Sequence, residues 1–284
     1  MKTPILTTGL DGLVGTRIAE LLNKELSFTN LSFQKGYDIT NITTIEKAFA
    51  NFTGEWVWHL AAATDVDRCE KEKDWAHAVN VIGTQNIVNL CKRYKKRLLF
   101  ISTDFVFHGN NKIYSEKDKP SPINYYGQTK YEAEKLVSKL GKHGLIVRIS
   151  FPYCAKNNEK KDFFHTILEK LQKKERVMAV DDMYFTPTFI DDIAEALHFL
   201  TIKGAFDIYH VTGSSLHTPY EATQLIADTF NLNKSLALPC SFSDYYQNRA
   251  PRPKSLKISN QKITKFGLKM HTFSEGLSIL KTKI

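Results

Sequence analysis

The chain has 284 residues, enough for one large α/β domain with or without a smaller satellite, and too many for a mini-protein held by disulfides. Hydrophobic residues make up 42% and charged residues 24% of the chain, which excludes a disordered or fibrous protein. The net charge of +9 favours an anionic partner: nucleic acid, an acidic membrane surface or a phosphorylated small molecule.

The cysteines stand far apart and form no C-x-x-C pair: Cys69, Cys91, Cys154 and Cys240. This spacing predicts neither a metal site nor a disulfide framework, and it favours reduced thiols. No apolar run approaches the roughly 20 residues of a membrane span, and no secretory leader precedes the first predicted strand. We therefore expect a cytoplasmic protein with no membrane partner.

The first half alternates short apolar runs with amphipathic stretches. The runs predict strands at residues 5–8, 31–33, 56–60, 97–102 and 145–149, and the stretches predict helices at 14–22, 43–52, 74–94 and 126–140. Repeated strand–helix units favour right-handed crossovers and a parallel sheet covered on both faces. The expected fold is α/β, a Rossmann-type doubly wound parallel sheet.

The alternation of predicted strands and helices becomes less regular after residue 150. Helices are expected at residues 163–174, 190–200 and 220–230, a strand at 208–211, and a loop-rich stretch at 236–253. No low-complexity linker divides the halves. We therefore predict a nucleotide-binding domain at residues 1–150. Residues 151–284 would form a small substrate-binding lobe that shares its cleft, with parts returning to the Rossmann sheet.

A glycine-rich turn follows the first predicted strand and opens the first helix. Gly9 would allow the tight turn, Gly12 the approach of a pyrophosphate, and Gly15 close packing of helix on strand. The N–H groups of Leu13 and Val14, at the helix N-terminus, would face the phosphates. Ordinary turns use glycine as well, but the strand–turn–helix context favours a dinucleotide site.

The second predicted strand carries no carboxylate before Asp38 that could bind a ribose 2′-hydroxyl. Lys35 in this region could instead meet a 2′-phosphate, which favours NADPH over NADH. A solvated surface lysine is the competing interpretation.

Tyr126 and Lys130 have the i, i+4 spacing that places them on one face of the predicted helix. A nearby ammonium would lower the pKa of the phenol and make it a usable acid–base group. Thr103 ends a buried strand, where it would face the same pocket and donate to a carbonyl oxygen. Taken singly, these residues are more often surface groups or a hydroxyl bonded within its own turn.

Together these residues resemble the extended short-chain dehydrogenases/reductases, and more narrowly the dTDP-4-dehydrorhamnose reductase group of sugar-nucleotide ketoreductases. The resemblance covers nearly the whole chain. Its most specific stretches are HLAAATDVDRCE (59–70), VNVIGTQN (79–86), STDFVFHG (102–109), YGQTK (126–130), PT (187–188) and RAPRPKSL (249–256).

The resemblance implies that Tyr126 protonates the reduced oxygen, Thr103 polarises the carbonyl, and Lys130 binds the nicotinamide ribose. It further assigns to the cofactor site Asp38, Ile39, Ala61, Ala62, Ala63 and Asn80, and to the substrate site Thr64, Val66, Asp104, Phe105, Phe151 and Arg252.

The sequence departs from the family pattern in the expected substrate lobe. Phe151 stands where the family usually has Trp, Asp162 where it has Asn, and Met183 and Phe185 where it has Gln and Gly. These departures leave the identity of the sugar open without touching the three residues expected to act on it.

The expected function is NAD(P)H-dependent reduction of the 4-keto group of a nucleoside-diphosphate 6-deoxysugar, and the family resemblance makes a homodimer an expected assembly. One alternative is a non-catalytic NADP-binding subunit like the regulatory subunit of methionine adenosyltransferase. Another is a sugar-nucleotide epimerase or dehydratase. A dehydratase needs a carboxylate beside the threonine, and Asp104 follows Thr103, although adjacent strand residues point to opposite faces.

The lysine-rich residues 156–176 could suggest a nucleic-acid or membrane patch. Apolar residues of the helix expected at 163–174 fall on one stripe, however, so a solvated helix face is favoured. We expect neither a nucleic-acid nor a membrane partner.

Overall fold

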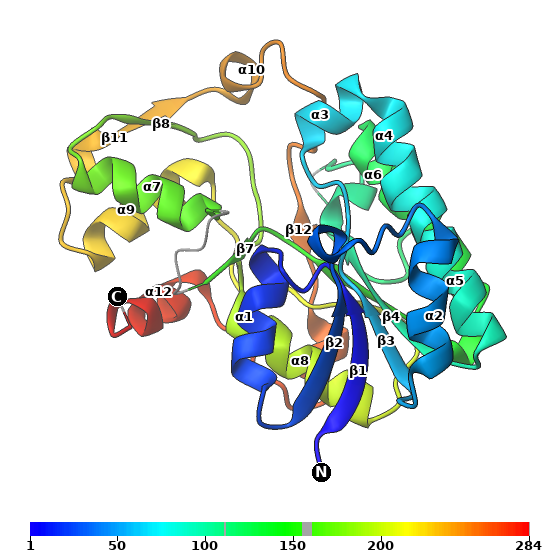
Figure 1. Cartoon of the computed structure of the whole chain (residues 1–284). Helices are drawn as coiled ribbons and strands as arrows, with labels where there is room; N and C mark the ends of the chain where they lie inside the picture. The colour runs from blue at the N-terminus through cyan, green and yellow to red at the C-terminus, as the bar shows by residue number, and fades with distance from the viewer. Residues whose placement is uncertain (111, 155–160, 284) are drawn as a thin grey trace.

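The computed structural model describes residues 1–110, 112–154 and 161–283, and a six-stranded parallel sheet forms its centre (Figure 1). The strand order is β10 (Asp207–His210), β6 (Gly144–Ile149), β4 (Arg97–Thr103), β3 (Trp56–His59), β1 (Thr3–Thr8) and β2 (Leu26–Leu31). The strand that follows β1 in the sequence, β2, pairs on one side of β1, and the next strand, β3, pairs on the other side. Ligands of such sheets bind beyond the carboxyl ends of the strands at this switch point. The expected Rossmann-type fold is confirmed.

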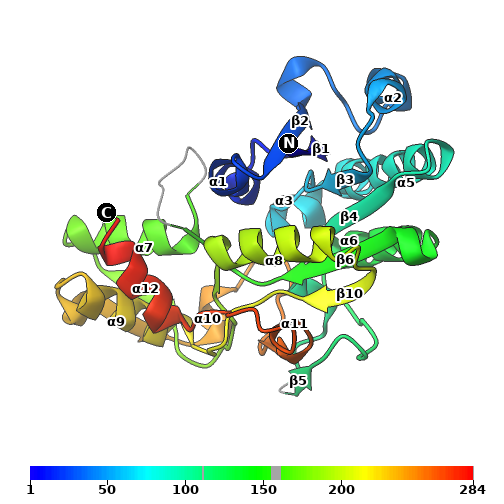
Figure 2. The same ribbon diagram turned by 90° about the horizontal axis from the view of Figure 1, so that it is seen from below.

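Two layers of helices cover the sheet (Figure 2). One layer contains α1 (Leu13–Leu22) and α8 (Ile190–Ile202), and the other contains α2 (Ile42–Asn51), α5 (Gly83–Arg93) and α6 (Tyr125–Ser138). The neighbouring residues Ile5 and Leu6 are both fully buried but belong to the two different cores. Burial on both faces explains why the central strands are continuously apolar.

Two of the elements predicted in the first half differ from the structure. The second strand is Leu26–Leu31, and residues 33–35 form the short 3-10 helix η1 (Phe33–Lys35). Among the described residues, this edge strand pairs with β1 alone, and only its end residues Leu26 and Leu31 are buried, so its apolar signal is weak. The helix expected at 74–94 comprises α4 (Lys73–His77), a π-helical segment at Ala78–Ile82, and α5. Such π segments are frequent at functional sites.

A second, smaller core lies beside the sheet (Figure 1). Around it pack α7 (Phe163–Gln172), α9 (Pro219–Thr229), α12 (Phe273–Lys281) and the parallel pair β8 (Val177–Val180) and β11 (Ala237–Cys240). The expected loop at 236–253 thus contains a strand and the short α10 (Phe242–Tyr245), and α12 was not predicted. Phe164, Leu168 and Leu171 of α7 are buried in this core, as the apolar stripe predicted, whereas the lysine-rich positions 156–160 lie outside the described residues.

The remaining elements are short. They are α3 (Val66–Lys71), the 3-10 turns η3 (Asp104–Val106), η4 (Gly141–His143) and η5 (Lys234–Leu236), α11 (Gln261–Thr264), and the two-stranded pairs β5 (Ile113–Tyr114) with β12 (Lys257–Ile258) and β7 (Pro152–Tyr153) with β9 (Thr188–Phe189).

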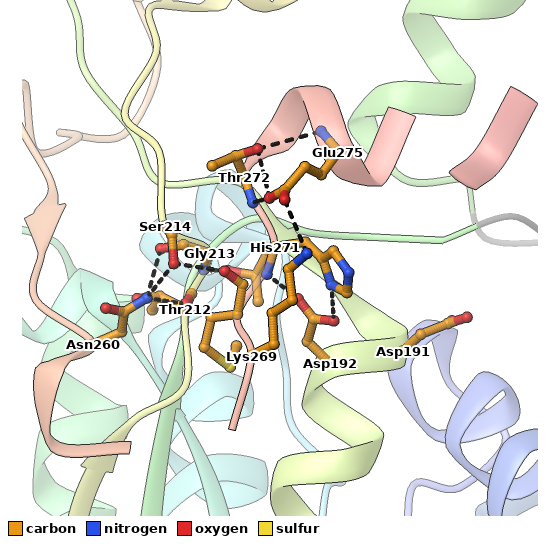
Figure 3. A network of polar contacts seen from close by, with 12 residues as sticks. Asp191, Asp192, Thr212, Gly213, Ser214, Asn260, Lys269, His271, Thr272 and Glu275 are labelled. Atoms are coloured by element: carbon orange, nitrogen blue, oxygen red, sulfur yellow. Dashed lines mark hydrogen bonds and ion pairs between the residues drawn. The ribbon is translucent and has the colours of Figure 1, made fainter. Parts of the chain in front are cut away.

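Polar contacts fasten the C-terminal part of the chain to α8 and to the loop after β10 (Figure 3). The Asp192 carboxylate accepts hydrogen bonds from the His271 backbone N–H at 2.7 Å and from its ring Nδ1 at 2.6 Å. Ser214 Oγ donates to the Met270 carbonyl at 2.6 Å, and the Asn260 amide donates to Thr212. Residues after 150 also supply α8 to one helical layer and β10 to the central sheet.

Across the three described stretches, no helix is both long enough and apolar enough to cross a membrane. All four cysteines are free thiols.

Candidate active site

The glycine turn after β1 is shaped by two close approaches of the backbone. Gly9 has φ of +72°, and a Cβ there would stand 2.4 Å from the Ala61 nitrogen. A Cβ on Gly15 would stand 2.6 Å from the Leu10 carbonyl oxygen. Gly12 differs, because a Cβ there would meet only the Gly9 oxygen, at 3.3 Å. Gly9 and Gly15 are thus required by the fold, whereas Gly12 keeps the outer side of the turn open.

The N-terminus of α1 is free to receive an anion. Gly12 is its N-cap, no side chain caps the helix, and its first turn holds no acidic residue. The first intrahelical backbone bond runs from Thr16 to Gly12, so the N–H groups of Leu13 and Val14 have no helical acceptor. Together with the positive end of the helix dipole, this turn fits the pyrophosphate of a dinucleotide.

Hydrogen bonds within the loop after β2, and one from α5, fix the conformation of this loop. The Asp38 carboxylate accepts from the Thr40 N–H at 2.9 Å and from its hydroxyl at 2.8 Å. Asn86 of α5 donates to the Ile39 carbonyl at 2.9 Å. Lys35 is exposed on η1, directly after the strand whose carboxyl end borders the expected adenosine site.

Asn80 in the π segment fixes the loop at residues 61–63. Its Oδ1 accepts from the Ala63 N–H at 2.8 Å, while its Nδ2 donates to the Ala63 carbonyl at 3.1 Å and to Thr129 Oγ at 2.9 Å. The side chain is 2% exposed. Asn80 therefore fixes Ala63, the last residue of this loop, through both of its amide atoms.

His59, at the end of β3, bridges two hydroxyl groups beneath this loop. Its Nδ1 lies 2.6 Å from Thr8 Oγ and its Nε2 lies 3.0 Å from Thr84 Oγ. Burial, assisted by the charge of Lys130, lowers the pKa of His59 to about 3. The neutral ring connects Thr8 of β1 with Thr84 at the start of α5.

Lys130 lies on the buried side of α6. Its Nζ donates to the Ile101 carbonyl at 2.8 Å and stands 4.1 Å from the centre of the Phe100 ring. Burial lowers the pKa of Lys130 to about 7, and Glu134 one turn further along the helix opposes this shift.

Tyr126 is also buried, at 9% exposure. Burial raises the pKa of its phenol well above the ordinary value, and hydrogen bonding with Thr103 acts in the opposite direction. From the sequence, Lys130 is expected to lower the pKa of Tyr126. In the structure, burial raises this pKa by more than the hydrogen bond with Thr103 lowers it. Tyr126 thus holds its proton at neutral pH, as a proton donor requires.

Thr103 and Asp104 form a buried pair at the end of β4. Thr103 Oγ donates to Asp104 Oδ1 at 3.1 Å and accepts from the Phe105 N–H at 3.2 Å. Asp104 Oδ2 accepts from Ser150 Oγ at 2.6 Å. The expectation that Asp104 points away from Thr103 was wrong, because the strand ends at Thr103 and the chain turns into η3.

Three contacts that the sequence analysis missed hold α6 in place. Asn124 caps the helix by accepting from the Gly127 N–H at 2.8 Å, and its amide donates to the Pro251 carbonyl at 2.8 Å. Glu70 of α3 accepts from the Tyr125 N–H at 2.9 Å. An asparagine directly before a helix is a recognisable capping signal; the Glu70 contact has no local signature.

Arg252 is part of a fixed segment beside α3. It donates to both carboxylate oxygens of Asp67, at 2.9 and 2.8 Å, and its guanidinium lies 5.0 Å from the centre of the Tyr246 ring. The Ala250 N–H also donates to Asp67, at 2.8 Å. A hollow of about 340 Å³ lies between this segment and α3.

Residues 1–283 match the family described as RmlD substrate binding domain. The chain belongs to this family. It superposes on the dTDP-4-dehydrorhamnose reductase of Bacillus anthracis in complex with NADP with a TM-score of 0.92 and 30% identity, and each chain is covered completely. It is 29% identical to the spore coat polysaccharide biosynthesis protein SpsK of Bacillus subtilis, over 97% of this chain and 95% of SpsK. It is also 27% identical to the mouse methionine adenosyltransferase 2 subunit beta, over 96% of this chain and 85% of that protein.

The side of this RmlD-family chain that is expected from the sequence to receive the substrate is aromatic. The Phe105 ring lies 5.8 Å from that of Tyr126 and 6.2 Å from that of Phe151, measured between ring centres. Phe151 adopts a left-handed φ of +39° and packs 4.7 Å from Phe185. Nearby, Thr64 is exposed and Val66 begins α3.

Of the remaining departures from the RmlD family pattern, two are buried in a core and one caps a helix. Phe185 and Met183 are buried in the core of the lobe. Asp162 caps α7 by accepting from the His165 N–H at 2.8 Å, and it also accepts from the Cys154 N–H at 3.0 Å.

Proposed function

We propose that this RmlD-family protein uses NAD(P)H to reduce the 4-keto group of a nucleoside-diphosphate 6-deoxysugar. The observation that carries the proposal is the buried Tyr126, which is hydrogen-bonded with Thr103 and lies one helical turn from Lys130 on α6. The open N-terminus of α1 supports a dinucleotide in the same crevice. A glycine turn alone would be weaker support, because many proteins bind nucleotides without a proton donor placed in this way.

Each group has one task in this mechanism. The dihydronicotinamide supplies the hydride when it is bound. Tyr126 donates its proton to the carbonyl oxygen as that oxygen gains negative charge, and Thr103 donates a hydrogen bond to the same oxygen. Lys130 holds the nicotinamide ribose through its ammonium. Burial of all three side chains strengthens these interactions by excluding water.

NADPH is the favoured cofactor. Lys35 is exposed on η1, which follows β2, and its ammonium is the cation that we assign to a 2′-phosphate. The carboxylate of Asp38 is already bonded to Thr40. The relative from Bacillus anthracis was solved with NADP.

On the substrate side, we assign the sugar to the space bordered by Thr64, Val66, Phe105 and Phe151, and the nucleotide end to Arg252. Asp67 fixes the guanidinium of Arg252 in one orientation. We retain the homodimer as the expected assembly.

The regulatory alternative rests on the methionine adenosyltransferase relatives. The dehydratase alternative needs Asp104 to reach the substrate as an acid. Ser150 and Thr103 already engage both oxygens of Asp104, and its side chain is buried, which favours simple reduction.

The test mixes the full chain with NADPH and a dTDP-4-keto-6-deoxyhexose and follows the loss of absorbance of the reduced nicotinamide. We expect cofactor consumption matched by formation of the 4-hydroxy sugar. Tight NADP binding without consumption of any 4-keto-6-deoxy sugar nucleotide would favour the regulatory alternative.

A further inference from the structure

The hydroxyl of Thr103 has a single hydrogen, and the positions of its hydrogen-bonding neighbours constrain its direction. Thr103 Oγ lies 3.1 Å from Asp104 Oδ1, to which it donates, and one of its lone pairs accepts from the Phe105 N–H. A hydroxyl bonded in this way has no hydrogen left for a substrate. The proposed role of Thr103 as a donor to the carbonyl therefore conflicts with an ionised Asp104.

Protonation of Asp104 removes the conflict. A carboxylic acid protonated at Oδ1 donates to Thr103 Oγ, which then accepts from both Asp104 and the Phe105 N–H. The hydrogen of Thr103 is released to point elsewhere, and Asp104 Oδ2 still accepts from Ser150. Asp104, Thr103, Ser150 and the Phe105 N–H each keep a partner in both states.

The surroundings of Asp104 make its protonation accessible near neutral pH. The side chain is 2% exposed, and among the residues that the structure describes no cation forms an ion pair with it. The nearby cations on α6 and β6 are engaged elsewhere, Lys130 with the Ile101 carbonyl and Arg148 with Glu134. From α6 the phenol of Tyr126 faces Asp104, and from β6 the hydroxyl of Ser150 does.

These groups have opposing effects on the carboxyl. Burial raises the pKa of Asp104 to about 6, against the hydrogen bonds from Ser150 and Thr103. The ionised and neutral forms therefore exchange within a pH range in which the enzyme can be assayed.

We propose that Asp104 is a positioning residue whose protonation turns the Thr103 hydroxyl from the carboxylate toward the substrate carbonyl oxygen. The proton comes from solvent and remains on Asp104, while Tyr126 alone supplies the proton that enters the product. This inference rests on the proposed function.

The test is the pH profile of kcat with saturating NADPH and sugar nucleotide. In the wild type we expect kcat to fall as pH rises above the pKa of Asp104, by up to about tenfold per pH unit. Asp104→Asn places an amide N–H against Thr103 Oγ at every pH, so its kcat should lack this decline and exceed that of the wild type at alkaline pH. Thr103→Val should lower kcat and abolish the decline without a comparable change in KM.

Ser150→Ala provides a second variant should Asp104→Asn fold poorly. Without the Ser150 hydrogen bond the ionised form loses stabilisation, so the decline in kcat should move to higher pH. An infrared titration gives a readout independent of turnover: a carboxylic C=O band should disappear with the same midpoint in the wild type and be missing in Asp104→Asn.

A wild-type decline that is unchanged in Asp104→Asn and Ser150→Ala would overturn the positioning role while leaving the reductase intact. Absence of turnover in every protein at every pH would instead refute the proposed function.

Discussion

The Arg148 guanidinium donates to both oxygens of the Glu134 carboxylate, at 2.8 and 2.7 Å, and neither side chain is more than 3% exposed. Ser102 Oγ adds a third hydrogen bond to Glu134, at 2.6 Å. The pair thereby joins α6, which carries Tyr126 and Lys130, to two strands of the sheet. The main consequence of the Arg148–Glu134 pair is that it fixes α6 against the sheet.

Removing one partner of this pair should be strongly destabilising. Glu134→Ala leaves the Arg148 charge buried without a counterion, and we expect the free energy of unfolding to fall by about 3–5 kcal/mol. Urea unfolding at neutral pH measures the loss. The double variant Glu134→Leu/Arg148→Met is the control and should recover most of the stability, because apolar side chains of similar volume need no pairing. A double variant as unstable as the single one would contradict this account.

Substitutions in the glycine turn should separate folding from cofactor binding. Gly12→Ala adds a methyl group only toward the open side of the turn, so it should leave the melting temperature nearly unchanged and weaken NADP binding at least about tenfold. Gly9→Ala and Gly15→Ala, the matched controls, should lower the melting temperature because their methyl groups would collide with backbone atoms. Calorimetry with NADP titration distinguishes the two effects. Unimpaired NADP binding by Gly12→Ala would exclude the pyrophosphate from this turn.

Tyr126→Phe removes the proposed proton donor and little else. We expect kcat to fall by about 10²–10⁴-fold, with the Kd for NADPH nearly unchanged. The neighbouring Tyr125→Phe is the control, because that hydroxyl lies outside the proposed trio and the substitution should preserve activity. A small loss in Tyr126→Phe would assign the proton transfer to another group.

Lys35→Glu tests the preference for the phosphorylated cofactor. Replacing the cation by an anion should raise the KM for NADPH about tenfold or more, through repulsion of the 2′-phosphate, and change the KM for NADH much less. Lys2→Glu, at the exposed chain start, changes the net charge equally and should preserve the ratio of the two KM values. Equal changes for both cofactors would place the 2′-phosphate elsewhere.

The sequence predicted those parts of the site that depend on local geometry. The tight turn between β1 and α1 requires residues without a Cβ, which the glycines Gly9 and Gly15 provide. Tyr126 and Lys130 lie on one face of α6 because they are four residues apart in a helix. The proposed dinucleotide site and the proposed proton donor could therefore be inferred from the sequence alone.

Contacts between distant segments could not be inferred in the same way. Asp67 and Arg252 are 185 residues apart, and nothing in either neighbourhood marks them as partners. The direction of the Asp104 carboxylate depended on where β4 ends, a boundary that strand periodicity does not define. The edge strand β2 was misplaced because exposure on one side dilutes its apolar pattern.

His210 gives a prediction about pH and stability. It is fully buried between the Arg148 guanidinium, 3.3 Å from its Nε2, and the Ser259 carbonyl, 3.1 Å from its Nδ1. Burial, together with the charge of Arg148, lowers the pKa of His210 to about 3, from an ordinary value of 6.5. The unfolded chain therefore takes up a proton on this residue as pH falls through 6.5, whereas the folded chain does so only near pH 3.

In that interval the unfolded state binds more protons, so His210 makes the fold less stable as pH decreases. Its contribution should approach about 1 kcal/mol per pH unit between about pH 6 and pH 4. The raised pKa of Asp104 acts in the opposite sense, because a carboxyl with a raised pKa binds its proton more readily in the folded state. The comparison must therefore be made between the wild type and His210→Gln.

The measurement is the free energy of urea unfolding of both proteins across this pH range. His210→Gln should cost stability at pH 8, where the histidine is neutral in both states, and this deficit should shrink steadily as pH falls. His59→Asn should show the same trend, because the pKa of His59 is also lowered to about 3. A deficit that stays constant from pH 8 to about pH 4 would mean that His210 gains its proton equally in both states, and would refute its assignment as a buried neutral ring.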